Sequence, residues 1–289
     1  MTKLFLDSDC EFTLEEANKL NATLICMPYN IKGKEYIPYV DFKEYDPHEY
    51  FEILRGGVLP TTSALNPEDY IRYFEPEFKK GNDIFYIHFS TVMSGSFNSM
   101  RIALENLHEQ YPERKFYEFD TKGITIMEYI IAREMAKLFN SGKSAEEVIA
   151  WGNENVDKFA CYFFADDLKF FAKSGRVKGI AAVMGNLMGI RPILTMGTDG
   201  KMGSIGKVKG RVNAVAKLVD YVTELGTELD KYEIIIGHAD NTSLVEALLK
   251  QLHERIGKDF KYIVVPVNPT AGAHCGPDTL GIAFRAIHR

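Results

Sequence analysis

The first half of the chain alternates short apolar runs with helical patterns, and this alternation constrains the fold more than any other feature of the sequence. Apolar runs that are typical of buried strands lie at residues 3–6, 22–27, 83–90 and 115–120. A polar loop and a helical pattern over residues 97–110 separate the last two runs. Strand, loop, helix and strand in this order predict parallel strands that are joined by right-handed crossovers.

The second half has a different pattern, with several strand-like runs around two long helical segments. Residues 191–196 and 201–209 flank a Thr-Asp-Gly turn and predict a pair of antiparallel strands. The other long elements expected are strands at 159–165, 232–237, 262–267 and 280–286 and helices at 212–225 and 243–256. The 289 residues suffice for two domains of ordinary size. We therefore predict an α/β protein with a parallel-sheet N-terminal domain, residues 1–155, and a mixed α/β C-terminal domain, residues 156–289.

Composition and charge narrow the class of function. The net charge of −6 disfavours a surface that binds nucleic acid or anionic lipid. No apolar run approaches the roughly 20 residues of a membrane helix, so we expect no integral membrane segment. Seven histidines show no metal-ligand spacing, and we predict neither a metal nor a cofactor. The cysteines are dispersed, which predicts reduced thiols in a cytoplasmic protein; they are Cys10, Cys26, Cys161 and Cys275.

Two hydroxyl-rich segments precede helical patterns and are candidates for binding an anion. They are Thr61–Ser63 and Ser90–Ser99, and both belong to the class of loops at the carboxyl ends of parallel strands, where such sheets bind ligands. Backbone N–H groups and the macrodipole favour negative charge at a helix N-terminus. Gly95 would let an oxyanion approach the main chain closely. Ordinary helix capping is the alternative for each segment taken alone.

The segment Gly272–Asp278 places a histidine among glycines just before the last strand-like run. We expect His274 at a loop–strand junction, where it is a better candidate for a ligand contact than a histidine packed in a core. Cys275 suggests a thiolate nucleophile, but neighbours in an extended chain point to opposite faces, which leaves His274 poorly placed to activate it.

Two other classes of function stay open on these residues. One is a hydrolase or acyltransferase that uses Ser94 or Cys275 with His274, although Ser94 lies outside any GxSxG motif and no third member is evident. The other is a regulatory module that binds a different small anion, which would need no apolar channel.

Methionines gather in residues 179–202, at positions 184, 188, 196 and 202. Core packing explains both this run and the pair Phe170–Phe171. The alternative is the lining of an apolar channel, because flexible methionine side chains adapt to long ligands. Periodicity does not separate the two interpretations.

Taken together, several of these segments resemble the DegV family of bacterial lipid-binding proteins, over nearly the whole chain. Ala64–Asn66 departs from the family's Gln-Pro-Ser, and Leu6–Asp9 departs from its opening Thr-Asp-Ser. Six segments in register carry the resemblance: Thr62–Pro67, Ser90–Ser99, Asp120–Thr121, Lys173–Arg176, His238–Asp240 and His274–Ala283.

The resemblance implies a two-domain protein that holds one long-chain fatty acid between its domains and presents it to an ATP-dependent fatty acid kinase, without catalytic residues of its own. The acyl chain would enter the C-terminal domain, and burying ~14 methylenes at ~0.8 kcal/mol each would favour binding by roughly 11 kcal/mol before association costs. The carboxylate would be held by Thr62, Ser94, the Gly95 amide and His274, and the wider site would include Ser63, Ser96 and Cys275. Arg176 and the cluster of Lys207, Lys209 and Arg211 are candidates for contacting the kinase or the incoming phosphate, with solvated surface charge as the alternative.

Overall fold

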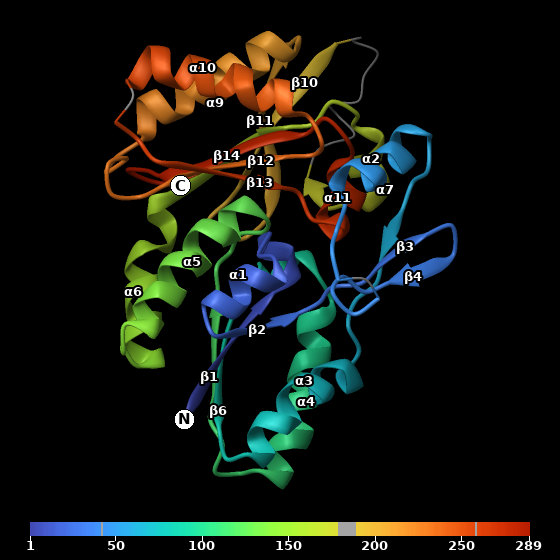
Figure 1. Ribbon diagram of the computed structural model, residues 1–289, viewed down its shortest axis with the longest axis vertical. Coiled ribbons are helices and arrows are strands. Elements are labelled where there is room, and N and C mark those ends of the chain that lie inside the picture. The colour runs from blue at the N-terminus through green and yellow to red at the C-terminus, as the bar shows by residue number, and fades with distance from the viewer. Residues whose placement is uncertain (42, 179–188, 258) are drawn as a thin grey trace.

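We describe the protein from a computed structural model, over residues 1–41, 43–178, 189–257 and 259–289. Two sheets lie in two lobes, with the N-terminus in the lower lobe and a larger sheet across the upper lobe (Figure 1). The predicted boundary near residue 155 falls between the last helix of the lower lobe and the first strand of the larger sheet.

The lower lobe is built on four parallel strands in the order β2-β1-β6-β7, which confirms the predicted parallel sheet. Each strand predicted here is present, with ends that differ by at most two residues. The strands are β1 (Thr2–Asp7), β2 (Ala22–Ile25), β6 (Asp83–His88) and β7 (Phe116–Asp120). The helices are α1 (Leu14–Lys19), α3 (Pro67–Lys79), α4 (Ser96–Gln110), α5 (Ile126–Asn140) and α6 (Ala145–Asn155).

Helix α3 shows why these segments become helices. Asn66 accepts a hydrogen bond from the backbone N–H of Asp69, whose side chain accepts one from the N–H of Asn66. This capping box, with proline at the first helical position, fixes the start of the helix. Tyr70, Phe74 and Phe78 recur at helical spacing and are buried, so one face of α3 packs into the core together with α4.

The upper lobe is a mixed seven-stranded sheet in the order β13-β12-β14-β8-β10-β11-β9. Its strands are β8 (Phe159–Phe164), β9 (Val177–Lys178), β10 (Ile190–Met196), β11 (Met202–Lys209), β12 (Ile234–His238), β13 (Tyr262–Pro266) and β14 (Leu280–Arg285). Helices α9 (Arg211–Leu225) and α10 (Thr242–Ile256) cover its upper face (Figure 1). The predicted pairing of 191–196 with 201–209 is confirmed as the antiparallel pair β10–β11. The short helices α7 (Lys169–Ser174) and α11 (Pro269–Cys275) lie at one end.

Helix α5 lies between the two sheets and contacts strands of both. Gly237 on β12 and Gly281 on β14 pair with each other across the upper sheet. A Cβ atom at Gly237 would lie 2.6 Å from the Ile126 side chain, and one at Gly281 would lie 3.0 Å from it. Glycine at these positions therefore lets the first turn of α5 approach the sheet.

The Arg289 side chain also connects the two lobes, through hydrogen bonds to backbone atoms of both. It is 1 % exposed, and it donates hydrogen bonds to the backbone oxygens of four residues. Two of them, Thr121 and Lys122, follow β7; Gly197 lies between β10 and β11, and Val156 precedes β8.

A small antiparallel sheet in the order β4-β3-β5 corrects one expectation from the sequence. It consists of β3 (Tyr29–Ile31), β4 (Lys34–Tyr36) and β5 (Thr61–Thr62), and α2 (Pro47–Arg55) follows β4. The segment Thr61–Ser63 therefore does not follow a parallel strand, because Thr61 and Thr62 pair with β3. Strand β4 ends at Tyr36, two residues before Pro38, which has no N–H to donate to a ladder.

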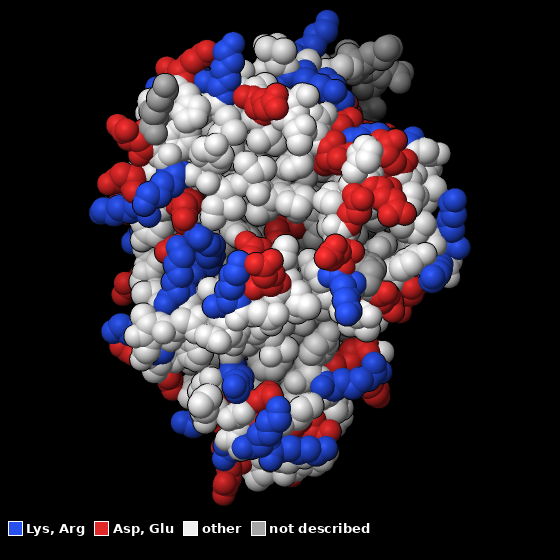
Figure 2. Space-filling view, in the orientation of Figure 1, with Lys and Arg blue, Asp and Glu red and all other residues white. Residues whose placement is uncertain are grey.

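The surface is mixed in charge. Lysines and arginines alternate with aspartates and glutamates over the face shown in Figure 2, around an uncharged area on the upper lobe. Within the described ranges, every helix is too short or too polar to traverse a bilayer.

Candidate functional site

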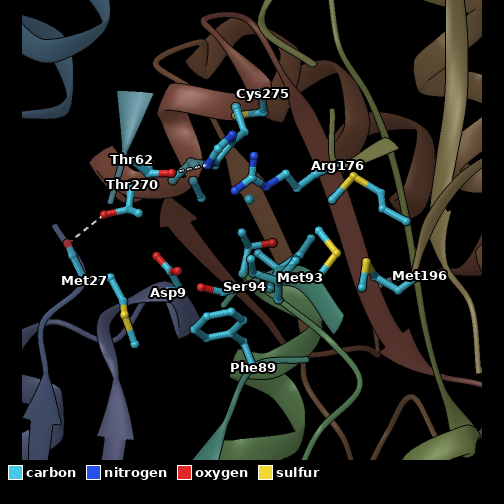
Figure 3. A pocket seen from close by; sticks show the side chains of 18 of the residues that line it. Asp9, Met27, Thr62, Phe89, Met93, Ser94, Arg176, Met196, Thr270 and Cys275 are labelled. Atoms are coloured by element: carbon cyan, nitrogen blue, oxygen red, sulfur yellow. Dashed lines mark hydrogen bonds between the residues drawn. The ribbon is translucent and has the colours of Figure 1, made fainter. Parts of the chain in front are cut away.

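A cavity lies where the lobes meet, bounded by the larger sheet, the start of α5, α11 and the loops after β1 and β6 (Figure 3). Its empty volume is about 990 Å³, which includes solvent at the mouth. The walls are mostly apolar, and the larger sheet contributes Cys161, Phe163, Met196, Met202, Gly237 and Gly281 to them. Phe171 of α7 also lines the cavity, whereas Phe170 is buried against Gly276. Of the methionine run, residues 184 and 188 lie outside the described residues.

One end of the cavity carries a polar pair from two distant segments. The Thr62 hydroxyl and Nε2 of His274 are 3.0 Å apart, and the dashed line in Figure 3 marks this contact. Thr62 is positioned by its pairing with Tyr29 in the small sheet, and Ser63 beside it also lines the cavity. The pair joins residues 212 positions apart in the sequence.

The expectation that His274 sits at a loop–strand junction is wrong, because residues 269–275 form helix α11. The Asn268 side chain caps this helix by accepting a hydrogen bond from the N–H of Ala271. Asn268 is itself held by Glu11, whose carboxylate accepts from both its backbone and its side-chain nitrogen. Asn-Pro before the glycines was the available signal for a helix start.

Burial and charge keep the His274 imidazole neutral. Burial, and secondarily the positive charge of Arg176, lower the pKa of His274 from 6.5 to about 4. Arg176 lines the same cavity. A neutral imidazole, a hydroxyl and a guanidinium therefore face one another at this end, and they suit a ligand with a negatively charged oxygen.

This pKa predicts how acid acts on the empty protein. The unfolded chain protonates His274 near pH 6.5 and the folded chain only near pH 4, so lowering the pH through this interval favours unfolding. We expect the wild type to lose about 3 kcal/mol more of its free energy of unfolding by pH 4 than a His274→Gln variant does. Denaturant titrations of both proteins across the interval measure the difference; parallel pH profiles would contradict it.

Ser94 and Gly95 lie between β6 and α4, and Ser96 is the first residue of α4. The hydroxyl of Ser96 accepts from the N–H of Leu65 and lies 2.9 Å from the Ser94 hydroxyl, which in turn accepts from the N–H of Ser96. Ser94 and Ser96 line the cavity, and Ser96 is buried. Ser96 therefore positions Ser94.

An open polar groove continues from this end of the cavity to the surface. Ser94, Arg176 and Met202 line both spaces, and Gly95 and Lys201 line the groove alone. A Cβ atom on Gly95 would meet no atom within 4 Å, so the main chain there is open to an approaching group. The groove thus connects the polar end of the cavity with solvent.

A model of the DegV family, described as uncharacterised, matches residues 1–286. The chain belongs to the DegV family. A DegV domain-containing protein of Clostridium perfringens is 29 % identical over 282 residues, which are 97 % of this chain and 96 % of that one.

Solved structures of DegV proteins share the fold. One from Thermus thermophilus, described as fatty-acid-binding, is 22 % identical with a TM-score of 0.85, over 98 % of this chain and 99 % of that one. The fatty acid kinase B3 protein of Streptococcus pneumoniae, loaded with linoleic acid, is 18 % identical with a TM-score of 0.80, over 99 % of both chains.

Cys275 of this DegV protein lines the cavity, but its surroundings differ from those of a nucleophile. Burial raises the pKa of the Cys275 thiol to about 12, and the thiol lies 3.5 Å from the backbone oxygen of Gly276. The reason given from sequence, an extended chain, is wrong because both residues are helical. His274 instead contacts Thr62, and Ser94 contacts Ser96.

The other basic residues predicted to dock a partner are placed differently from Arg176. Arg211 forms ion pairs with Asp166 and Asp278, at 2.7 and 3.0 Å. Lys209 ends β11 and is exposed. A docking role for these residues stays a prediction.

Sequence reasoning missed several residues of the cavity. Asp9 follows β1, Phe89 follows β6, and Thr125 precedes α5. Asp9 and Phe89 follow parallel strands, and ligands of such sheets bind beyond the carboxyl ends of the strands, so position alone was a signal for both residues. Neither residue belongs to the hydroxyl-rich segments that the sequence singled out. Thr125 has φ 55°, uncommon for a β-branched residue, and no sequence motif announces this conformation.

Proposed function

We propose that this DegV protein binds a long-chain fatty acid, burying the acyl chain against the larger sheet and holding the carboxylate near Thr62, Ser94 and His274. The observation that carries the proposal is a mostly apolar cavity with its polar side chains gathered where it meets an open groove. Ser63, Ser96 and Cys275 complete the proposed wall around the headgroup, and the Gly95 amide approaches it from the groove.

The physical chemistry of a fatty acid matches both ends of this cavity. Each buried methylene contributes ~0.8 kcal/mol, so a long apolar wall gives most of the affinity. A carboxylate that is buried without hydrogen-bond partners would cancel several kcal/mol of this binding free energy. Hydroxyl, imidazole and guanidinium groups supply the partners. A small polar ligand would leave the apolar wall from β8, β12 and β14 unused.

We propose binding and presentation rather than turnover. In the described structure, the contacts of Ser94 and Cys275 lack the nucleophile–base hydrogen bond of a hydrolase, since His274 is paired with Thr62. The presentation partner would be an ATP-dependent fatty acid kinase, because the groove lets a partner reach the carboxylate end. Arg176, Lys209 and Arg211 are the proposed contacts, and residues 1–155 and 156–289 are the proposed domains.

Mass spectrometry of the denatured recombinant protein is expected to release a long-chain fatty acid, because a tightly buried acyl chain survives purification. Stripped protein should take up labelled palmitate or oleate, and a fatty acid kinase with ATP should phosphorylate the bound acid. Protein that arrives empty and takes up neither acid would refute the proposed binding, and uptake without phosphorylation by such kinases would refute the presentation.

A further inference from the structure

Asp9 places a carboxyl group on the wall of the cavity, where apolar residues predominate. It lies in the short 3-10 turn after β1, is 5 % exposed, and lines the cavity. Figure 3 shows its carboxyl group turned into the cavity, in this view below Thr62 and Thr270. Oδ1 of Asp9 has no hydrogen-bond partner among the residues that the structure describes.

The backbone on both sides of this side chain is fixed. The N–H of Asp9 donates to Oδ1 of Asp7 at 2.9 Å, and its carbonyl oxygen accepts from the N–H of Thr125 at 2.8 Å. Asp7 is held in turn by the N–H of Phe89. The Asp9 carboxyl group is therefore aimed at the cavity by contacts that its own side chain does not make.

Burial and the neighbouring negative charge both favour the protonated form of this carboxyl group. Burial, and then the negative charge of Asp7, raise the pKa of Asp9 well above its ordinary value. Glu11 and Glu128 are also buried acids, and each of them lies near Asp9. A neutral carboxylic acid carries an O–H donor, and a buried donor without a partner is costly.

We propose that Asp9 is a further ligand-binding residue of the cavity and donates a hydrogen bond to an oxygen atom of the bound acyl ligand. The inference rests on the proposed function and deepens it. The chemistry is that of an acceptor oxygen, supplied either by the ligand's own carboxylate or by a hydroxyl or keto oxygen along its chain. An acceptor there would satisfy the one cavity-facing acid that the protein leaves unpaired in the described residues.

The test compares Asp9→Leu with Asp9→Asn, because leucine removes the donor but keeps a branched side chain with the same number of non-hydrogen atoms, whereas asparagine keeps an N–H donor. We expect Asp9→Leu to bind about tenfold more weakly than wild type while its empty form melts at the same or a higher temperature, since an unpaired polar group has been removed. Asp9→Asn should bind within about twofold of wild type. Glu128→Gln is the control, because Glu128 is another buried acid near Asp9 but is absent from the cavity wall.

Stearate and a hydroxystearate with its hydroxyl in mid-chain separate the two oxygen sources. An equal loss of affinity for both ligands in Asp9→Leu assigns the contact to the carboxylate, and a loss confined to the hydroxystearate assigns it to the chain oxygen. Affinities of Asp9→Leu equal to wild type for both ligands, or an Asp9→Asn variant as weak as Asp9→Leu, would overturn the inference. Wild type that binds neither ligand would instead refute the proposed function.

Discussion

Replacing Thr62 and His274 together by alanine is expected to weaken fatty acid binding about a hundredfold and to leave the fold intact. A hydrogen bond to a charged group contributes about 1.5–3 kcal/mol, and the double variant removes the hydroxyl–imidazole pair that supplies such a donor to the carboxylate. Thr62 lies at the edge of a small sheet and His274 at the end of a short helix, so neither supports the main core.

The increase in melting temperature on adding palmitate measures this loss, because a ligand that binds only the folded state stabilises it in proportion to its affinity. Thr61→Ala is the matched control, since Thr61 lies on the same strand, is exposed and is absent from the cavity wall. The losses of binding free energy in the two single variants should not sum to the loss in the double variant, because the Thr62 hydroxyl and Nε2 of His274 are 3.0 Å apart and interact. An unchanged ligand-induced shift in the double variant would remove these residues from the headgroup site.

The fold was predictable to the extent that local patterns determine it. Period-2 and period-3.6 patterns located the strands and helices of both lobes, and the strand–helix rhythm identified the parallel sheet. The short strands β3 and β5 were missed, because two or three residues carry no periodicity. Helix α11 was missed because Gly272 is a poor helix former. Glycine is needed at this position because a Cβ atom there would lie about 3 Å from the rings of Tyr50 and Phe51 of α2.

Site residues that belong to a sequence motif could be predicted, whereas contacts that only the tertiary structure brings together could not. Thr62, Ser94 and His274 were found as residue types, but the contact between Thr62 and His274 depends on the pairing of β3 with β5. The direction of the Asp9 side chain depends on a hydrogen bond between the Thr125 N–H and the Asp9 carbonyl oxygen. These residues are 116 positions apart in the sequence, so no local pattern predicts the contact.

A bulky side chain at Cys161, on β8 in the cavity wall, is expected to weaken the binding of long fatty acids strongly. The Cys161 side chain is buried and lines the cavity, on the strand next to β14, which carries Gly281. A Cys161→Phe substitution would put a phenyl ring into the space assigned to the acyl chain. If it displaces about four methylenes at ~0.8 kcal/mol each, stearate and palmitate lose about 3 kcal/mol, which is about two orders of magnitude in Kd.

The same substitution should spare short acids, because they do not reach the blocked part of the cavity. We therefore expect Cys161→Phe to shift the preferred chain length downwards, with octanoate affinity close to that of wild type. Cys161→Ala is the matched control; it removes the thiol without adding volume and should keep wild-type affinity for every chain length. A uniform loss for octanoate and stearate in Cys161→Phe, with stearate still preferred as in wild type, would mean that the acyl chain does not run along β8. The chain-length profile thus reports the path of the tail independently of the groups that hold its carboxylate.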